Sequence, residues 1–294
     1  MPQLDLIDTF PEFLTYWKKA QDQSMAVQVE SWAEQYMNHW PELRQKQIDC
    51  YTEDGEDWRA IAREHIFPFL SVNLPAMAIA HDNFGTVTET IYHRCRQFLD
   101  FNGDIVCILY VGIGCGAGWA TSYNGKPAIL FGLENIAAEK WQDQETLSGL
   151  MAHELGHLAH FHWRDQAGLT HNENPWWQLY TEGFAQWCEH LIMGKDSWHM
   201  KTAVGEQWQV WGQDNLSWLA AEFLRRVDND EDIRPFFGSW FELQGYKQTG
   251  YFLGHELLKR MRVQSGLHEI ALIEDVESQL RPLLTQLADS NKKP

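Results

Sequence analysis

The sequence predicts an α+β fold that is mainly helical and carries one small antiparallel sheet. Apolar residues recur at three- and four-residue spacings along most of the chain, which indicates amphipathic helices. A β-branched and apolar run at 105–111, then an Asn-Gly pair and a second apolar run at 128–131, indicate a strand and a hairpin. The 294 residues are 44% hydrophobic and 13% aromatic, which excludes a disordered chain.

Residues 1–100 are predicted to form an N-terminal helical region. Pro11 stands where a first helical residue is favoured, and aromatic residues then follow at helical spacing. Prolines and one Asp-Gly turn divide this segment into several helices. It holds no cluster of chemically active side chains, so its expected role is packing. Residues 101–294 are predicted to form a second region, and the two together one continuous two-lobed unit.

A glycine-rich run at 112–121 follows the first predicted strand. No Gly-Lys-Ser/Thr sequence follows it, so a phosphate-binding loop is disfavoured, and we expect a bent edge strand beside a cleft. Asp143 is the expected N-cap of the next helix. The helices predicted after the hairpin cover 144–163, 176–192, 249–263 and 268–287.

Charge and cysteine usage narrow the class of protein. The formal charge is −18, from 23 basic and 41 acidic side chains, and no basic stripe is present, which disfavours a nucleic-acid partner. Five cysteines without a C-x-x-C pair disfavour disulfides and Cys-based zinc sites. The first residues lack the features of a signal peptide, and no apolar run could span a membrane. We therefore expect a soluble cytoplasmic protein without a membrane partner; the oligomeric state is not predicted.

The central motif is His153-Glu154-Leu155-Gly156-His157, an H-E-x-x-H sequence. Two histidines four residues apart on a helix lie about 40° apart around its axis, so both imidazoles can reach one ion. Glu154 is rotated by about 100° from His153, which suits a general base acting on a metal-bound water. Gly156 is unfavourable within a helix, so we expect something to approach the helix backbone closely there.

A catalytic zinc takes three protein ligands, and Glu182 is the predicted third. It lies 25 residues after His157, in a second helix that can return to face the first. Glu189 or Gln186, further along that helix, could orient a ligating histidine through its other ring nitrogen. His160 shares the helix face of the motif but lies further along the axis. A position at the rim is expected for it, with contact to the substrate or to the metal ligands as the alternatives.

These motifs resemble the gluzincin clan of zinc peptidases, in which H-E-x-x-H is followed by a helix reading E-G-F-A, here Glu182-Gly-Phe-Ala185. A longer resemblance is to an uncharacterised family of predicted zinc-dependent proteases. It includes the glycine-rich strand, the segment Ile129-Leu-Phe-Gly-Leu-Glu134 and a later Gly250-Tyr-Phe-Leu-Gly254, and covers roughly residues 85–285. It implies a zincin-like metallopeptidase region at 101–294, with the small sheet packed beside the active-site helix. The G-x-M-E-N segment of the aminopeptidases is absent, which disfavours that activity.

The predicted activity is zinc-dependent hydrolysis of a peptide or protein substrate. His153, His157 and Glu182 would hold Zn²⁺, and Glu154 would move the proton of the attacking water. Tyr251 is the candidate for stabilising the oxyanion, with Tyr246 and His255 behind it. The glycine-rich edge strand could hold an extended peptide by backbone pairing. The alternatives are a zinc-binding regulatory or interaction protein with vestigial or no peptidase activity, and hydrolysis of a non-peptide amide.

Overall fold

Four strands form one sheet in the computed structural model, which describes residues 3–171, 173–201, 205, 207–238 and 240–290. The order across the sheet is β1-β2-β4-β3. The pairs β1–β2 and β2–β4 are parallel, whereas β3 runs antiparallel to β4. The strands are β1 (Leu4–Asp8), β2 (Ile105–Tyr110), β3 (Gly118–Tyr123) and β4 (Lys126–Gly132).

The sheet confirms the predicted strand and hairpin but not their all-antiparallel pairing. Asn124 and Gly125 connect β3 to β4 with φ of 49° and 72°, as a type I′ turn requires. The prediction of a wholly antiparallel sheet is wrong for two reasons. Strand β4, and not β3, pairs with β2, and this pairing is parallel. In addition, a long helical segment separates β1 from β2. That segment brings the chain back so that β2 pairs with β1 in parallel, with Leu4 beside Ile105.

Helices occupy most of residues 10–99, as predicted. Pro11 lies in the first turn of α1, and Asp100, with φ of 49°, ends α5 in a left-handed conformation. The helices are α1 (Phe10–Ala20), α2 (Met25–Ser31), α3 (Pro41–Thr52), α4 (Trp58–Ile61) and α5 (Phe67–Leu99), with π-helical or 3₁₀ turns at Trp32–Tyr36, Met37–His39 and Ala62–Ile66.

Aromatic side chains join these helices to the sheet. All six residues of β2 are buried, which matches its uninterrupted apolar sequence. Phe84 of α5 packs against Phe131 of β4 with ring centroids 4.4 Å apart. The hydroxyl of Tyr36 lies 2.5 Å from that of Thr9 and accepts the backbone N–H of Val111 at 3.1 Å. The ends of β1 and β2 are thereby fixed to the N-terminal helices.

The helices that follow the hairpin match most of the predicted ranges. The predicted helix 268–287 is interrupted and forms two helices, α14 and α15. The helices are α6 (Leu133–Ala138), α7 (Gln144–Gln166), α8 (Pro175–Met193), α10 (Trp208–Asp214), α11 (Leu216–Asp228), α12 (Arg234–Phe237), α13 (Thr249–Met261), α14 (Leu267–Ala271) and α15 (Val276–Asp289).

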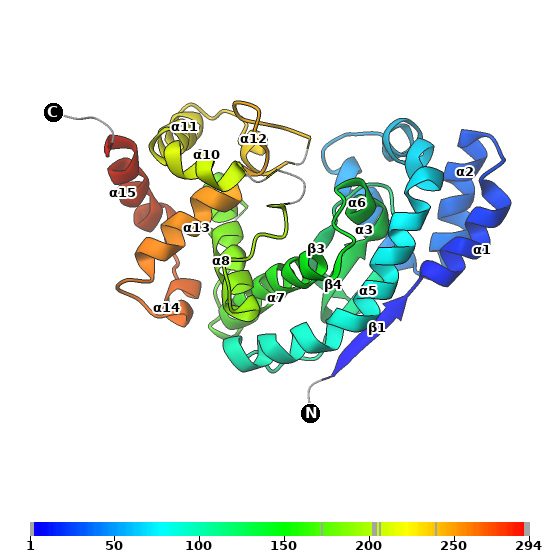
Figure 1. Ribbon diagram of the computed structural model, residues 1–294, viewed down its shortest axis with the longest axis horizontal. Coiled ribbons are helices and arrows are strands. Elements are labelled where there is room, and N and C mark those ends of the chain that lie inside the picture. Colours follow the sequence, from blue (N-terminus) through cyan, green and yellow to red (C-terminus); the bar gives the residue numbers. More distant parts are fainter. Residues whose placement is uncertain (1–2, 172, 202–204, 206, 239, 291–294) are drawn as a thin grey trace. The chain divides into compact units, whose positions relative to one another are not determined.

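Helices α8 and α13 pack side by side (Figure 1). At their crossing a Cβ on Gly183 would lie 2.4 Å from the backbone of Gly254, and a Cβ on Gly254 would lie 2.8 Å from Gly183 Cα. Real Cβ atoms do not approach so closely, so both positions require glycine. Gly183 is therefore required for the packing of α8 on α13, and it follows directly after Glu182, the predicted metal ligand.

Internal contacts divide the chain into two compact units. The first unit is Met1–Arg96 with Asp100–Glu154, and the second unit is Gln97–Leu99 with Leu155–Pro294. Helix α7 continues through this division, so the H-E-x-x-H motif lies on one uninterrupted helix. The predicted division near residue 100, within one two-lobed unit, stays a prediction.

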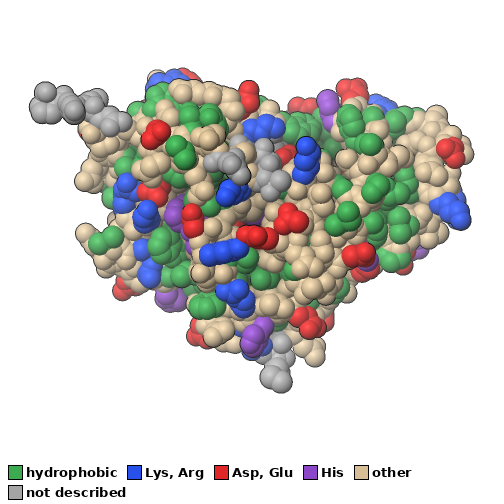
Figure 2. Space-filling view, in the orientation of Figure 1, with side chains coloured by type: hydrophobic (Ala, Val, Ile, Leu, Met, Phe, Trp, Pro, Cys, Tyr) green, Lys and Arg blue, Asp and Glu red, His purple; other side chains and the backbone are tan. Residues whose placement is uncertain are grey.

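The surface carries charged side chains of both signs (Figure 2). Acidic side chains, which set the formal charge of −18, are interspersed with basic ones over the face seen in Figure 2. Within the described residues, no helix combines the length and the apolar character needed to cross a bilayer.

Candidate metal centre

Helix α7 carries the H-E-x-x-H motif in a buried setting. The carboxylate of Asp143 accepts the backbone N–H of Thr146 at 3.0 Å, so the predicted N-cap is confirmed. His153, Glu154 and His157 are only 2%, 7% and 9% exposed. Polar side chains buried to this degree need hydrogen-bond or metal partners. The motif therefore belongs to the interior of the protein and not to a solvated helix face.

Helix α8 approaches α7 closely at Gly156. A Cβ there would lie 2.7 Å from the Cβ of Cys188 and 3.1 Å from the Cα of Ala185. The close approach expected from this glycine is confirmed, and the neighbouring element is α8. Asn174 caps α8 by accepting the N–H of Trp177 at 2.8 Å. Because α7 and α8 are in contact at Gly156, the face of α8 that bears Glu182 lies next to the motif.

His153, His157 and Glu182 form a group that can hold a metal ion. Each offers one ligand atom, and the three atoms lie within 4.8 Å of one another. The Nε2 atom of His157 and an oxygen of Glu182 are 3.4 Å apart. Two ligand atoms on one tetrahedral ion at ~2.1 Å are separated by about this distance. Two imidazoles and one carboxylate also form a donor set that zinc takes in catalytic sites, so the residues fit the predicted ion.

A second group, His153 with Glu189 and His199, also has ligand atoms within 4.8 Å of one another. Glu189 is fully buried. One carboxylate oxygen accepts hydrogen bonds from the Ser197 hydroxyl at 2.8 Å and the His199 backbone N–H at 2.9 Å. The other oxygen lies 2.8 Å from His199 Nδ1. Because these contacts already use the Glu189 carboxylate, we assign the metal-holding role to the first group.

The structure refines the prediction for Glu189 and Gln186. Glu189 lies near His153, as a group that orients a ligating histidine should. Gln186 instead donates from its side chain to the carbonyl of Ser197 at 2.7 Å, so it holds the segment that follows α8. Sequence reasoning missed His199, since it lies in an irregular segment without a motif or period to mark it.

Glu154, the predicted general base, lies beside the first residue of β3. A Cβ on Gly118 would be 2.6 Å from a carboxylate oxygen of Glu154 and 2.9 Å from its Cγ. A larger residue at position 118 would therefore displace the Glu154 side chain from this place. Strand β3 is an edge strand, as expected for the glycine-rich run, and Gly118–Thr121 are partly exposed.

Tyr251 lies on α13, and its ring meets that of His199 edge-on, with centroids 6.4 Å apart. It also packs against Phe237. Its role in stabilising an oxyanion stays a prediction. Of the two residues considered behind it, Tyr246 stacks on Trp211 at 4.3 Å. His255 lies in a separate cavity, described below.

His160 is not at a rim, as was expected, but fully buried. Its ring stacks on Phe184 with centroids 4.3 Å apart, and its Nε2 lies 3.2 Å from the carbonyl oxygen of Ala271. Burial lowers the pKa of His160 well below its usual value. The expectation is wrong because α8 and α14 cover this turn of α7, so His160 is a neutral core residue.

The glycine-rich run packs around the buried carboxylate of Glu134. Glu134, on α6, is fully buried and accepts the backbone N–H of Gly114 at 3.2 Å. A Cβ on Gly112 would lie 2.7 Å from the same oxygen. Burial raises the pKa of Glu134 to about 7, although the N–H groups of Gly112 and Gly114 act in the opposite direction. Close packing against Glu134 thus explains Gly112, whereas Gly114 is explained by its φ of 95° and by Ile66, which a Cβ would meet at 2.5 Å.

Three comparisons with known proteins found no match. No protein-family model matches the chain, and neither a curated protein nor a solved structure is similar to it.

Proposed function

We propose that this chain is a zincin-like metallopeptidase that hydrolyses peptide bonds with a metal-activated water. The observation that carries this proposal is the juxtaposition of His153, His157 and Glu182 around one point, with Glu154 on the same buried helix. A metal site that only stabilises a fold has no need of a carboxylate next to its ligands. The gluzincin-like motifs in the sequence support the same reaction.

His153, His157 and Glu182 would hold the ion. A bound zinc would lower the pKa of its water towards about 7 and polarise the scissile carbonyl. Glu189, by binding His199 and lying near His153, would fix the orientation of the side chains around this point.

Glu154 would act as the proton carrier. Its carboxylate accepts a proton from the attacking water and then delivers it to the nitrogen of the leaving amine. Because Gly118 has no side chain, the carboxylate has a fixed place between α7 and the start of β3. Tyr251 would donate a hydrogen bond to the oxygen on which negative charge develops.

Strand β3 supports a peptide as the substrate class. It lies at the edge of the sheet, and its first residue lies beside Glu154. An extended peptide paired with this strand would place its backbone carbonyls next to the proposed base. A non-peptide amide would gain no comparable pairing from the strand.

A Glu154→Gln variant tests the proposal. We expect it to bind one zinc per chain, as measured by elemental analysis, and to lose about 100-fold or more of its cleavage rate on a peptide library. Glu145→Gln, an exposed change on the same helix, is the matched control and should leave the rate unchanged. If the wild-type protein binds zinc and cleaves no peptide, the chain is a metal-binding regulatory protein and the peptidase proposal is wrong.

A further inference from the structure

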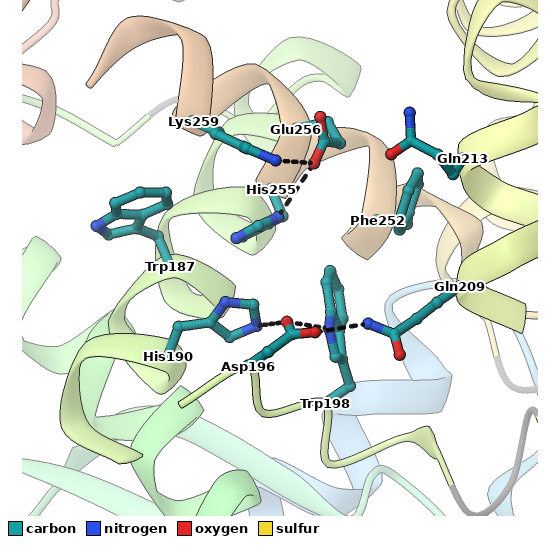
Figure 3. A pocket seen from close by; sticks show the side chains of 10 residues that line it. All are labelled: Trp187, His190, Asp196, Trp198, Gln209, Gln213, Phe252, His255, Glu256 and Lys259. Atoms are coloured by element: carbon teal, nitrogen blue, oxygen red, sulfur yellow. Dashed lines mark hydrogen bonds and ion pairs between the residues drawn. The ribbon is translucent and has the colours of Figure 1, made fainter. Parts of the chain in front are cut away.

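A cavity of about 420 Å³ lies within the second unit, apart from the proposed metal ligands. Its walls come from α8, from the segment 196–198, from α10 and from α13 (Figure 3). Its volume is in the range of small-molecule sites. Its lining includes His190, Asp196, Trp198, Phe252, His255 and Glu256.

His255 lines the floor of the cavity and lies between Trp187 and Trp198 (Figure 3). It is 7% exposed, and neither ring nitrogen has a hydrogen-bond partner among the described residues. The nearest carboxylate oxygen, on Glu256, is 3.9 Å from Nδ1, which is too far for a hydrogen bond. A neutral imidazole offers one donor and one acceptor. A buried side chain with both unused points to a ligand that hydrogen-bonds to it.

The protonation of His255 agrees with this interpretation. Burial lowers its pKa to about 4, and His190, whose ring centroid is 4.4 Å away, acts in the same direction. The ring is therefore neutral near pH 7. A neutral imidazole places no positive charge in the cavity and can accept a hydrogen bond from an ammonium group.

The charges around the cavity favour a cation. Asp196 accepts the indole N–H of Trp198 at 2.8 Å and an amide N–H of Gln209 at 3.1 Å. These bonds fix its carboxylate, yet its side chain is 68% exposed. Glu256 differs, because its carboxylate is used by two cations, Lys259 at 3.2 Å and Arg260 at 2.9 Å. Asp196 has the imidazole of His190 at 3.5 Å but no lysine or arginine partner among the described residues, so it is the lining carboxylate left for a cation.

Aromatic rings supply the apolar part of the site. Trp198 and Phe252 stack with centroids 5.9 Å apart, and Trp187 stacks on His255 at 5.6 Å. Ring faces attract organic cations through their quadrupoles, most strongly in surroundings that exclude water. The ring edges also provide apolar contact for the body of a ligand.

We propose that this cavity binds a small organic amine with an apolar body, whose ammonium group pairs with Asp196 and whose apolar part packs on Trp198 and Phe252. His255 would hydrogen-bond to the same ligand from the floor of the cavity. The site is independent of the proposed hydrolysis, since it includes none of the metal ligands.

Isothermal titration calorimetry on the full chain tests this site with three probes of similar shape: 2-phenylethylamine, 2-phenylethanol and 3-phenylpropionate. The titrations contain EDTA, so that no amine binds through a metal. We expect the amine to bind about tenfold more tightly than the alcohol, the acid to bind most weakly, and the preference to shrink at high salt. Equal binding of the three probes, or no binding of the amine at millimolar concentration, overturns the proposal.

The variant Asp196→Asn should lower the affinity for the amine about tenfold and leave the affinity for the alcohol unchanged. Asp214→Asn, an exposed acid on α10 outside the cavity, is the matched control. His255→Asn should weaken both ligands, because it removes the ring at the floor. Circular dichroism confirms that each variant is folded; an Asp196→Asn protein that is folded and binds the amine as tightly as wild type refutes the assignment.

Discussion

Replacing Glu134 by glutamine should change how stability depends on pH. Burial raises the pKa of this carboxyl from 4.5 to about 7, so the folded chain binds more protons than the unfolded chain between these values. The protonated carboxyl therefore stabilises the folded state. This stabilisation is fully present below pH 4.5 and is lost as the pH rises through about 7. Each pKa unit corresponds to about 1.4 kcal/mol, so the full loss is about 3 kcal/mol.

About 2 kcal/mol of that loss falls between pH 5.5 and pH 8, a range in which unfolding can be measured. Urea unfolding with EDTA present, at both pH values, gives the free energy of unfolding of wild type and of Glu134→Gln. We expect the variant to gain about 2 kcal/mol relative to wild type on going from pH 5.5 to pH 8. Glu89→Gln, an exposed change on α5 in the same unit, should show no such gain.

Parallel curves for wild type and Glu134→Gln would refute this reasoning. They would mean that the N–H groups of Gly112 and Gly114 stabilise the carboxylate enough to cancel the effect of burial. Other groups of the chain titrate in both proteins. Their effects therefore cancel when the free energy of unfolding of the variant is compared with that of wild type.

Two further predictions concern the metal ligands and the helix crossing. His153→Ala and Glu182→Gln should each weaken zinc binding by about 100-fold, measured by competition with a chelating dye, whereas exposed His171→Ala should not. Gly183→Ala should destabilise the fold by about 1–3 kcal/mol in urea unfolding, because its Cβ would lie 2.4 Å from the backbone of α13. Gly85→Ala, a helical glycine with nothing within 4 Å, should be neutral or stabilising.

The parts of the fold that local sequence determines were predictable. The Asn124-Gly125 turn and the capping residue Asp143 act on their immediate neighbours, so the hairpin and the start of α7 followed from the sequence. Strand β1 could not be found in this way. It is short, lies at the edge of the sheet, and exists because β2, about a hundred residues later, pairs with it.

The same distinction applies to the candidate site. The i, i+4 spacing of His153 and His157 fixes their proximity through the helix alone, and Glu182 followed from a plausible return of the chain. His199 lies in an irregular segment, and no local sequence pattern predicts its contact with Glu189. His160 was misplaced because its exposure depends on α8 and α14, which pack on α7 only in the folded protein.

The crossing of Gly183 and Gly254 has a consequence for engineering. Glu182, a proposed metal ligand, precedes one of these glycines, and His255, at the floor of the cavity, follows the other. Because the two backbones are in contact there, α8 and α13 cannot slide past each other without a clash. The metal ligand and the cavity floor therefore share one rigid module, and a chimera that exchanges only one of these helices should lose both sites together.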